Sequence, residues 1–491
     1  MADEIQAGCF GRLFRRKAAP RQCVEFVPPV GKPTSKHTST EKPRDEEETD
    51  DVHYFSPCCD FSYGPAREWW SAQDSLPPYT SELSISSCDD KDIAYVIEKK
   101  LDEANSGLRQ LSLEIHDNPE LMFQERYAHD ILTKYMSDNG FKVTKHYLGL
   151  ETAWRAEYTQ GVGGRVIGVN SEMDALPGIG HACGHNLIAI AGVGVAIALR
   201  AALRAQPHVS GTVVLLGTPA EEGGGGKAIL LERGAYKGMD ICIMCHPSPG
   251  APRTTSVGSS NAMQSLKVEY FGHSAHAGSA PWEGTNALDA AFIAYSSISM
   301  LRQQMKPDHR VHGIVEGKNW AANVIPDYAH MRWIARAPTS ADLIPFVKRV
   351  QNCLQAAALA TGCKIKLTPE YTYFDLHQNP VLAQGFADIV GSRYGLATTT
   401  QNTSASTDFG NVTYALPALH PAFAIPTQPN GGNHTAAFAD AARGEAAHEA
   451  VMTVTKGLAL TGYRVLTDSQ FFSRVQASFE QSKLTKDIPD L

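Results

Sequence analysis

The segment His-Ala-Cys-Gly-His-Asn at residues 181–186 brings two histidines and a cysteine close together in the chain. Imidazole and thiolate are zinc ligands in proteins, but a zinc site needs four ligands or three and an open position. By itself the segment is also compatible with a redox thiol or with a polar turn. Ligands from elsewhere in the chain are needed to decide between these interpretations.

Other ligand-type side chains follow apolar runs that have the character of buried strands. Asp174 follows one such run, the pair Glu221 and Glu222 follows the run Val-Val-Leu-Leu-Gly-Thr-Pro-Ala, and His246 ends a third. His434 lies later, in a Gly-Asn turn before an expected helix. If the runs are parallel strands of one sheet, their carboxyl ends meet at the edge where α/β proteins bind ligands.

This convergence favours a metal site. The potential ligands are more than one catalytic ion needs and enough for two ions that share a ligand: Cys183, His185, Glu222, His246 and His434. Glu221 adjoins a proposed ligand, so we expect it to act as general base toward a metal-polarised water, an arrangement suited to amide cleavage. Thiolate and imidazole are soft ligands, which favours zinc over manganese.

Each motif taken alone also has an ordinary structural interpretation. A cysteine or histidine at a strand end is more often structural than a ligand, and paired glutamates usually form a solvated turn. Two further patterns are set aside. Cys242-Ile-Met-Cys-His resembles a haem attachment motif but lies in a strand-like stretch, and the Gly-Gly-Gly-Gly-Lys at 223–227 lacks the spacing of a phosphate loop.

The bulk composition indicates a globular protein of two or three domains. The chain has 491 residues, of which 43% are hydrophobic and 20% charged. A net charge of −8 argues against nucleic acid as the main partner. The first residues lack the apolar core of a secretion signal, and the apolar run 187–199 is too short to span a bilayer. We therefore expect a cytoplasmic protein with reduced cysteines.

The chain divides into three kinds of sequence. Residues 1–88 are rich in polar and charged residues, which predicts a largely disordered extension. Residues 89–257 and 373–491 alternate strand and helix patterns, which predicts an α/β catalytic domain with a mixed, mostly parallel sheet. Residues 258–372 follow a β-α-β-β-α-β order, typical of an inserted α+β domain with the open-sandwich, ferredoxin-like fold.

Six motifs, in chain order, together resemble the aminoacylase-type family of co-catalytic metallopeptidases (metallopeptidase family twenty), which includes the auxin-conjugate hydrolases. They are SEMDALPG, HACGHN, PAEEGGGGK, GHSAHAGSAPWEGTNALDA, NVIPDYA and STDFGNV with the later LPALHP and NHT. The resemblance covers about residues 90–460. It is strongest to the cytosolic dipeptidases that cleave dipeptides ending in a basic residue, of the β-alanyl-lysine or Xaa-Arg type.

The resemblance implies a role for each matching residue. It assigns the bridging position between two divalent ions to Cys183. His185 and His246 would complete one metal site, and Glu222 and His434 the other. Glu221 matches the general base, and Asp174 a residue that orients a ligand or that base.

The resemblance also implies functions for the inserted domain, which would act as a lid and dimerise. His276 matches a histidine that reaches the partner's active site to stabilise the oxyanion, and Asn323 and Arg336 match positions that hold the substrate's carboxylate. The expected substrate is a dipeptide or an N-acyl amino acid. The family usually has His-x-Asp where this chain has Glu172-Met-Asp174, and Asn186 replaces an aspartate of the auxin-conjugate branch.

Two alternatives remain open from the sequence. One is an N-acyl-amino-acid hydrolase of the aminoacylase or auxin-conjugate kind, which would differ in the pocket for the acyl group. The other is a catalytically silent dimeric binding or scaffold protein. Loss of Glu221 or of a ligand would mark the scaffold, and the chain has kept all of these residues.

Overall fold

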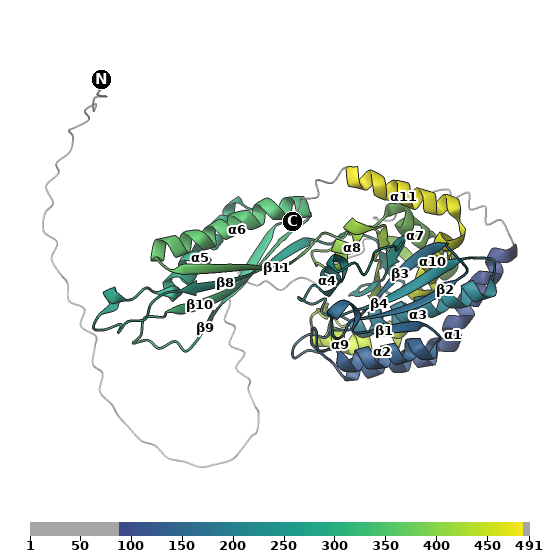
Figure 1. Ribbon diagram of the computed structural model, residues 1–491, viewed down its shortest axis with the longest axis horizontal. Helices are drawn as coiled ribbons and strands as arrows, with labels where there is room; N and C mark the ends of the chain where they lie inside the picture. The colour runs from purple at the N-terminus through teal and green to yellow at the C-terminus, as the bar shows by residue number, and fades with distance from the viewer. Residues whose placement is uncertain (1–87, 485–491) are drawn as a thin grey trace, which may run out of the picture. The chain divides into compact units, whose positions relative to one another are not determined.

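The structure is a computed structural model that describes residues 88–484 (Figure 1). The expected N-terminal extension lies outside these residues, apart from the start of the first helix at Cys88. The fold is built on three sheets. Two of them carry large hydrophobic cores.

The largest sheet has six strands in the order β1-β2-β4-β3-β5-β13. β4 pairs with β3, β3 with β5, and β5 with β13 in parallel, while β1–β2 and β2–β4 are antiparallel. The expected mixed, mostly parallel sheet is thus confirmed. Its strands are β1 (Lys142–Lys145), β2 (Trp154–Gln160), β3 (Arg165–Glu172), β4 (Gly211–Thr218), β5 (Ile241–Ile243) and β13 (Ala418–Leu419).

Helices cover both faces of this sheet. Along β4, Val213 and Leu215 belong to the core shared with α1 (Cys88–Asp117), α3 (His185–Ala205) and α10 (Glu445–Thr467). Val214 and Leu216 belong to the core shared with α4 (Gly226–Glu232) and α8 (Phe409–Ala415). Burial on both faces explains why the strand is a continuous apolar run rather than an alternating one.

The helix α3 owes its apolar sequence to its place inside this layer. It is long and apolar enough to cross a membrane, with a mean hydropathy of 2.0, but 89% of that apolar window is buried within the fold. It lies against β3 and β4 on one side and α1 and α10 on the other. Its small residues allow close approach, since a side chain at Gly192 would clash with Ser171 and the Asn170 carbonyl.

The segment from β8 to β11 forms its own antiparallel sheet, in the order β11-β8-β10-β9, with α5 and α6 on one face (Figure 1). The elements are β8 (Ala262–Phe271), α5 (Ala287–Leu301), β9 (Arg310–Gly317), β10 (Tyr328–Ala337), α6 (Ser340–Thr361) and β11 (Lys364–Tyr373). Their order and the separate core confirm the inserted α+β fold. The exact domain boundaries stay a prediction.

A third sheet was not expected from the sequence. It joins β6 (His246–Pro249), β7 (Thr254–Ser256), β12 (Ala397–Thr399) and β14 (Ala422–Ile425) in the order β12-β7-β14-β6. The run 239–248, predicted as a single strand, therefore contains two strands in different sheets. Pro247 and Pro249 lack the N–H groups that would pair β6 on both sides, so the chain cannot continue β5 as a central strand.

The remaining elements are four helices of the catalytic part of the chain and three short turns, two of which lie in the inserted segment. They are α2 (Arg126–Asp138), α7 (Pro380–Tyr394), α9 (Ala436–Arg443) and α11 (Ser469–Leu484), with single 3-10 turns at Tyr147–Gly149, Pro281–Glu283 and Arg302–Gln304. Local signals define several of their ends. Asn379 caps α7 by accepting from Val381 and Leu382 N–H groups, and Pro380 takes the first helical position.

Candidate active site

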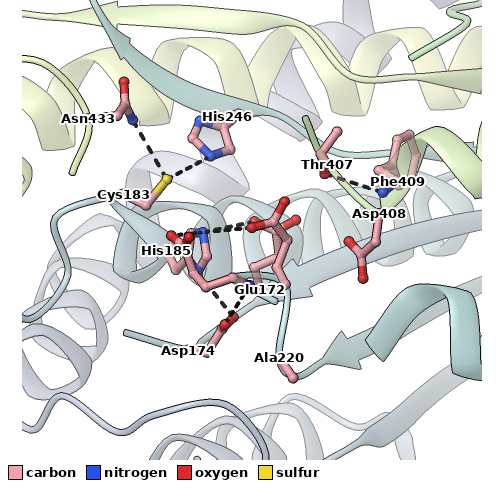
Figure 2. A network of polar contacts seen from close by, with 12 residues as sticks. Glu172, Asp174, Cys183, His185, Ala220, His246, Thr407, Asp408, Phe409 and Asn433 are labelled. Atoms are coloured by element: carbon pink, nitrogen blue, oxygen red, sulfur yellow. Dashed lines mark hydrogen bonds and ion pairs between the residues drawn. The ribbon is translucent and has the colours of Figure 1, made fainter. Parts of the chain in front are cut away.

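The predicted ligands meet at the carboxyl edge of the six-stranded sheet (Figure 2). Asp174 follows β3, the pair Glu221 and Glu222 follows β4, and His246 lies just beyond β5. Because β4, β3 and β5 are parallel neighbours, these loops leave the sheet side by side. The sequence prediction of a shared edge therefore holds for these residues.

The donor atoms cluster closely enough to hold metal ions. Cys183 Sγ lies 3.4 Å from His246 Nε2. Three sets of donors are each contained within 4.8 Å: Cys183 with His185 and His246, Cys183 with Glu222 and His434, and His185 with Glu221 and Glu222. Cys183 is common to the first two sets, as a bridging ligand must be. Among the residues that the structure describes, His185 Nε2 and Glu222 Oε1 are buried and have no hydrogen-bond partner, as expected of atoms that face a cation.

Asp174 orients two of the candidate ligands. Its Oδ1 lies 3.2 Å from His185 Nδ1, and its Oδ2 accepts a 3.0 Å hydrogen bond from the Glu222 N–H. A bond to Nδ1 leaves His185 Nε2 directed toward the other donors. Burial opposes a charge on this ring, but Glu172 and Asp174 outweigh it and raise the pKa of His185 well above its usual value.

The two adjacent glutamates occupy opposed electrostatic environments. Burial and the neighbouring charges of Glu172 and Glu222 raise the pKa of Glu221 well above its usual value. Burial also acts on Glu222, but hydrogen bonding to His434 and the charge of His185 prevail and lower its pKa. Carboxylates separated in this way take different roles, one as proton carrier and one as permanent anion.

Cys183 is buried, and burial followed by the charge of Glu222 raises the pKa of its thiol well above the usual value. A cation would have to displace the thiol proton, because the thiolate is the form that binds metal. Asn433 Nδ2 lies 3.8 Å from Cys183 Sγ and donates to the Pro247 carbonyl at 3.3 Å (Figure 2). Asn433 thereby joins the Cys183 loop to β6.

Two ligand loops contain strained backbone. Ala220 has a φ of 60° and His434 a φ of 68°, both in the left-handed region that residues other than glycine seldom occupy. The His434 N–H donates to the Ala182 carbonyl at 2.8 Å, which fixes the loop against the Cys183 segment. The same turn places His434 Nε2 3.4 Å from Glu222 Oε2.

A buried ion cluster behind the glutamates was missed by the sequence reasoning. Lys227 Nζ lies 2.7 Å from Glu172 Oε1 and 2.6 Å from Asp408 Oδ1, and all three side chains are fully buried. Carboxylate oxygens of Glu172, Glu221 and Asp408 lie within 4.8 Å of one another. Lys227 thus supplies the positive charge that lets these carboxylates share one site. The only sequence signals are the lysine after four glycines and the aspartate of STDFGNV.

The four glycines permit a tight turn beside Glu221 and Glu222. Gly225 has a φ of 64°, and a side chain there would clash with Tyr371. A side chain at Gly226 would lie 1.8 Å from the Pro219 carbonyl oxygen. The loop folds back on itself in this way and presents Glu221 and Glu222 toward the other donors.

Glu125, at the N-terminus of α2, was also missed. Its Oε1 accepts from the Ala220 N–H at 2.9 Å and its Oε2 from Thr152 Oγ1 at 2.7 Å. Burial, followed by the charge of Asp174, raises the pKa of Glu125 to about 7. No short motif announces this contact, which joins residues 95 positions apart.

The candidates on the inserted segment are less enclosed. Arg336 donates to Ser406 Oγ at 2.9 Å and is half-buried, whereas His276 and Asn323 are exposed. His276 Nδ1 accepts hydrogen bonds from the Gly278 and Ser279 N–H groups at 3.1 and 3.2 Å. Within residues 88–484, neither His276 nor Asn323 makes a hydrogen bond or ion pair with the candidate ligands. The structure therefore does not bring these two residues into the cluster.

Comparison with known proteins gives concordant results. Residues 168–461 match the model of peptidase family M20/M25/M40. The chain is 40% identical to the Xaa-Arg dipeptidase of Mus musculus over 401 residues, covering 78% of this chain and 91% of the relative. It is 37% identical to the Xaa-Arg dipeptidase of Homo sapiens, with 77% and 90% covered.

The fold also matches solved structures. The YXEP protein of Bacillus subtilis, a dinuclear metal-binding peptidase, superposes with a TM-score of 0.57 at 20% identity, covering 74% of this chain and 99% of that one. The aminobenzoyl-glutamate utilization protein of Klebsiella pneumoniae gives 0.60 at 18% identity, covering 76% and 99%.

The fold and the clustered donors define a metal-dependent hydrolase of peptide or amide bonds. The match over 168–461, together with the long alignments to the dipeptidases, shows that the chain belongs to peptidase family M20/M25/M40. The resemblance read from the six motifs is thereby confirmed. The scaffold and acyl-hydrolase alternatives are not favoured.

Proposed function

We propose that the protein is a cytoplasmic dipeptidase that removes a C-terminal basic residue with two divalent ions, preferably zinc. The proposal is carried by two sets of metal-donor atoms that share Cys183 and lie beside Glu221 and Glu222. The pKa of Glu221 is raised and that of Glu222 is lowered. The preference for a basic residue is supported by the Xaa-Arg dipeptidases, which align over most of the chain. The free cysteines recorded in the described residues agree with a reducing compartment.

The residues present fit the metal ions. Cys183, His185 and His246 would hold one ion, and Cys183, Glu222 and His434 the other. Asp174 keeps His185 and Glu222 in place through its two oxygens. When bound, such ions lower the pKa of a water molecule and polarise a carbonyl. Sulfur and imidazole donors favour zinc over manganese.

Glu221 is the proton carrier of the proposed reaction. It accepts a proton from the attacking water and then delivers it to the leaving amine, so its carboxylate must be ionised at the first step and protonated at the second. Its raised pKa suits the second step, since a weakly acidic group holds its proton until the amine departs. Because Glu222 has a lowered pKa, it remains an anion throughout.

Residues of the inserted segment bind the substrate's carboxylate and the oxyanion. We assign the carboxylate to Arg336 and Asn323, since a guanidinium presents a planar pair of donors to it. The two backbone bonds to His276 Nδ1 place its proton on Nε2, so the neutral ring presents a donor. That donor is suited to an oxyanion, a contact often worth about 3 kcal/mol.

We assign His276 to the active site of a second copy in a homodimer formed by the inserted segment, taken as residues 258–372. His276 is exposed and makes no bond to the candidate ligands of its own chain within residues 88–484. The same segment exposes large apolar side chains, with Trp282 78%, Phe292 58% and Met300 68% accessible. Apolar side chains exposed in this way are typical of protein interfaces.

A substrate panel tests the proposed specificity. Initial rates are measured for alanyl-arginine, alanyl-lysine, alanyl-glutamate and N-acetyl-arginine, with zinc present. The expected result is turnover of the two basic dipeptides and little of the other two. Preferential cleavage of N-acetyl-arginine would replace the dipeptidase by an acyl-amino-acid hydrolase, and preference for alanyl-glutamate would overturn the basic specificity.

A further inference from the structure

The loop that carries Glu221 is also held by a residue of the inserted sheet. Tyr373 is the last residue of β11, and its hydroxyl donates to the Glu221 carbonyl oxygen at 2.7 Å. The Tyr373 hydroxyl oxygen in turn accepts a hydrogen bond from the Gly225 N–H at 2.9 Å. Tyr373 is 2% exposed, so both bonds are shielded from water. One hydroxyl therefore joins the two ends of the turn between Glu221 and Gly225.

The other attachments of this loop come from a different part of the fold. Glu125 binds the Ala220 N–H and Asp174 binds the Glu222 N–H, and both belong to the part of the chain that builds the six-stranded sheet. Tyr373 belongs to the sheet β11-β8-β10-β9. The loop of Glu221 is therefore anchored to two sheets.

An irregularity in β11 precedes Tyr373, the residue that contacts this loop. Its register with β8 shifts between Pro369 and Thr372, where β11 has one residue more than its partner. An extra residue of this kind changes the face on which the following side chains lie. Asn411 then fixes the strand, because its Nδ2 donates to the Thr372 carbonyl at 2.9 Å and its Oδ1 accepts from the Phe374 N–H at 3.1 Å.

We propose that Tyr373 is a positioning residue that couples the inserted sheet to the general base Glu221. The inference rests on the proposed role of Glu221 and adds the route by which the inserted sheet controls it. Tyr373 touches neither metal nor substrate in this account. Its hydroxyl places the base, and a shift of a reacting group by about 1 Å can cost up to about a hundredfold in rate.

The test compares two tyrosine hydroxyls of the same sheet, Tyr373 at the end of β11 and Tyr270 in β8. Tyr373→Phe removes the hydroxyl that binds Glu221, and Tyr270→Phe removes a buried hydroxyl that donates to the Leu354 carbonyl at 2.9 Å. We expect Tyr373→Phe to lower kcat about tenfold with KM within about twofold of wild type, and Tyr270→Phe to leave kcat unchanged. Equal kcat for wild type and Tyr373→Phe would overturn the inference.

A double variant separates this inference from the proposed function. In a Glu221→Gln background, Tyr373→Phe should lower the residual kcat no further, because its effect passes through Glu221. A full additional tenfold loss would show that Tyr373 acts by another route. If Glu221→Gln alone keeps wild-type kcat, the proposed function fails; if it loses activity while Tyr373→Phe does not, only the coupling fails.

Asn411→Asp provides a second variant should Tyr373→Phe not fold. It keeps the acceptor for the Phe374 N–H and loses the donor to the Thr372 carbonyl, which loosens β11 while the Tyr373 hydroxyl remains. We expect a fall in kcat of about threefold with unchanged metal content, in line with loss of one modest hydrogen bond. Unchanged kcat in a folded Asn411→Asp would contradict the coupling.

Discussion

The two sides of the proposed active site differ in how their residues are held. On the side of the six-stranded sheet, His185, Glu172 and Lys227 are fully buried and each has charged partners within 4 Å. On the side of the inserted segment, His276 and Asn323 are exposed. The first side is held by contacts within the chain, whereas in our proposal the second is completed by the substrate and a second copy.

A pair of lysine–aspartate contacts shows what this difference means energetically. Lys227 and Asp408 are fully buried beside the glutamates, while Lys306 and Asp342 lie at the surface of the inserted segment, with side chains 61% and 33% exposed. Water screens the surface pair, so its contribution to stability is small. The buried pair has no water to replace a lost partner, which makes removal of either member costly.

The largest expected effect is the loss of the buried lysine. Lys227→Met removes the cation that Glu172 and Asp408 share, which should lower the free energy of unfolding by about 3 to 5 kcal/mol. Urea unfolding followed by circular dichroism measures it. Lys306→Met, the matched control, should leave the unfolding curve unchanged. Glu172→Gln added to Lys227→Met should restore part of the loss by removing one negative charge. Equal unfolding curves for Lys227→Met and Lys306→Met would show that the buried pair contributes no more to stability than the surface pair.

The next effect is a pH dependence of stability that comes from Glu125, the carboxylate that accepts a hydrogen bond from the Ala220 N–H. Burial raises the pKa of Glu125 from 4.5 to about 7, so the folded state binds the proton more tightly than the unfolded one. The resulting stabilisation is complete below pH 4.5 and disappears as the pH rises to about 7, a change of about 3 kcal/mol. Glu125→Gln should flatten the unfolding free energy over this window relative to wild type. If the free energy of unfolding varied with pH in the same way for wild type and Glu125→Gln, the raised pKa of Glu125 would be refuted.

A variant of His276, in the inserted segment, is expected to change kcat without changing the free energy of unfolding. His276→Ala should lower kcat about a hundredfold, as loss of an oxyanion donor does, with unchanged unfolding because the ring is exposed. His273→Ala, an exposed histidine of the same loop, is the control and should retain wild-type kcat.

Mixing variants tests whether His276 acts on the partner subunit. Equal amounts of His276→Ala and Glu221→Gln protein, unfolded and refolded together, should recover roughly a quarter of wild-type activity. Half of the dimers are then mixed, and each mixed dimer has one complete site. No recovery, with mixed dimers demonstrated by mass spectrometry, would place His276 in the active site of its own chain.

The sequence allowed the fold class and the clustered ligands to be predicted because both follow from local patterns. Apolar runs mark strands, and the residue after a strand end lies at the sheet edge whatever the rest of the chain does. Cys183, Glu222 and His246 could therefore be placed together before any coordinates. The β-α-β-β-α-β order could likewise be predicted, because stretches with the apolar pattern of strands are separated by stretches with that of helices.

The contacts that hold the ligands could not be predicted in this way. Lys227 meets Asp408 across 181 positions, and Tyr373 meets Glu221 across 152. Such pairs depend on how distant segments pack, which no local pattern records. The change of sheet after Ile243 could not be predicted for a related reason. It depends on the pairing of β5 with β13 and of β6 with β14, which lie within residues 418–425.

The most direct test of the central claim is metal content and turnover measured on the same samples of wild type and Glu221→Gln. Protein is dialysed against zinc, assayed for bound metal by mass spectrometry, and then supplied with alanyl-arginine. We expect close to two ions per chain in both proteins, and a kcat in the variant lowered by about a thousandfold, within the range for loss of a general base. Undiminished turnover by Glu221→Gln, or wild-type protein that binds no stoichiometric metal, would contradict it.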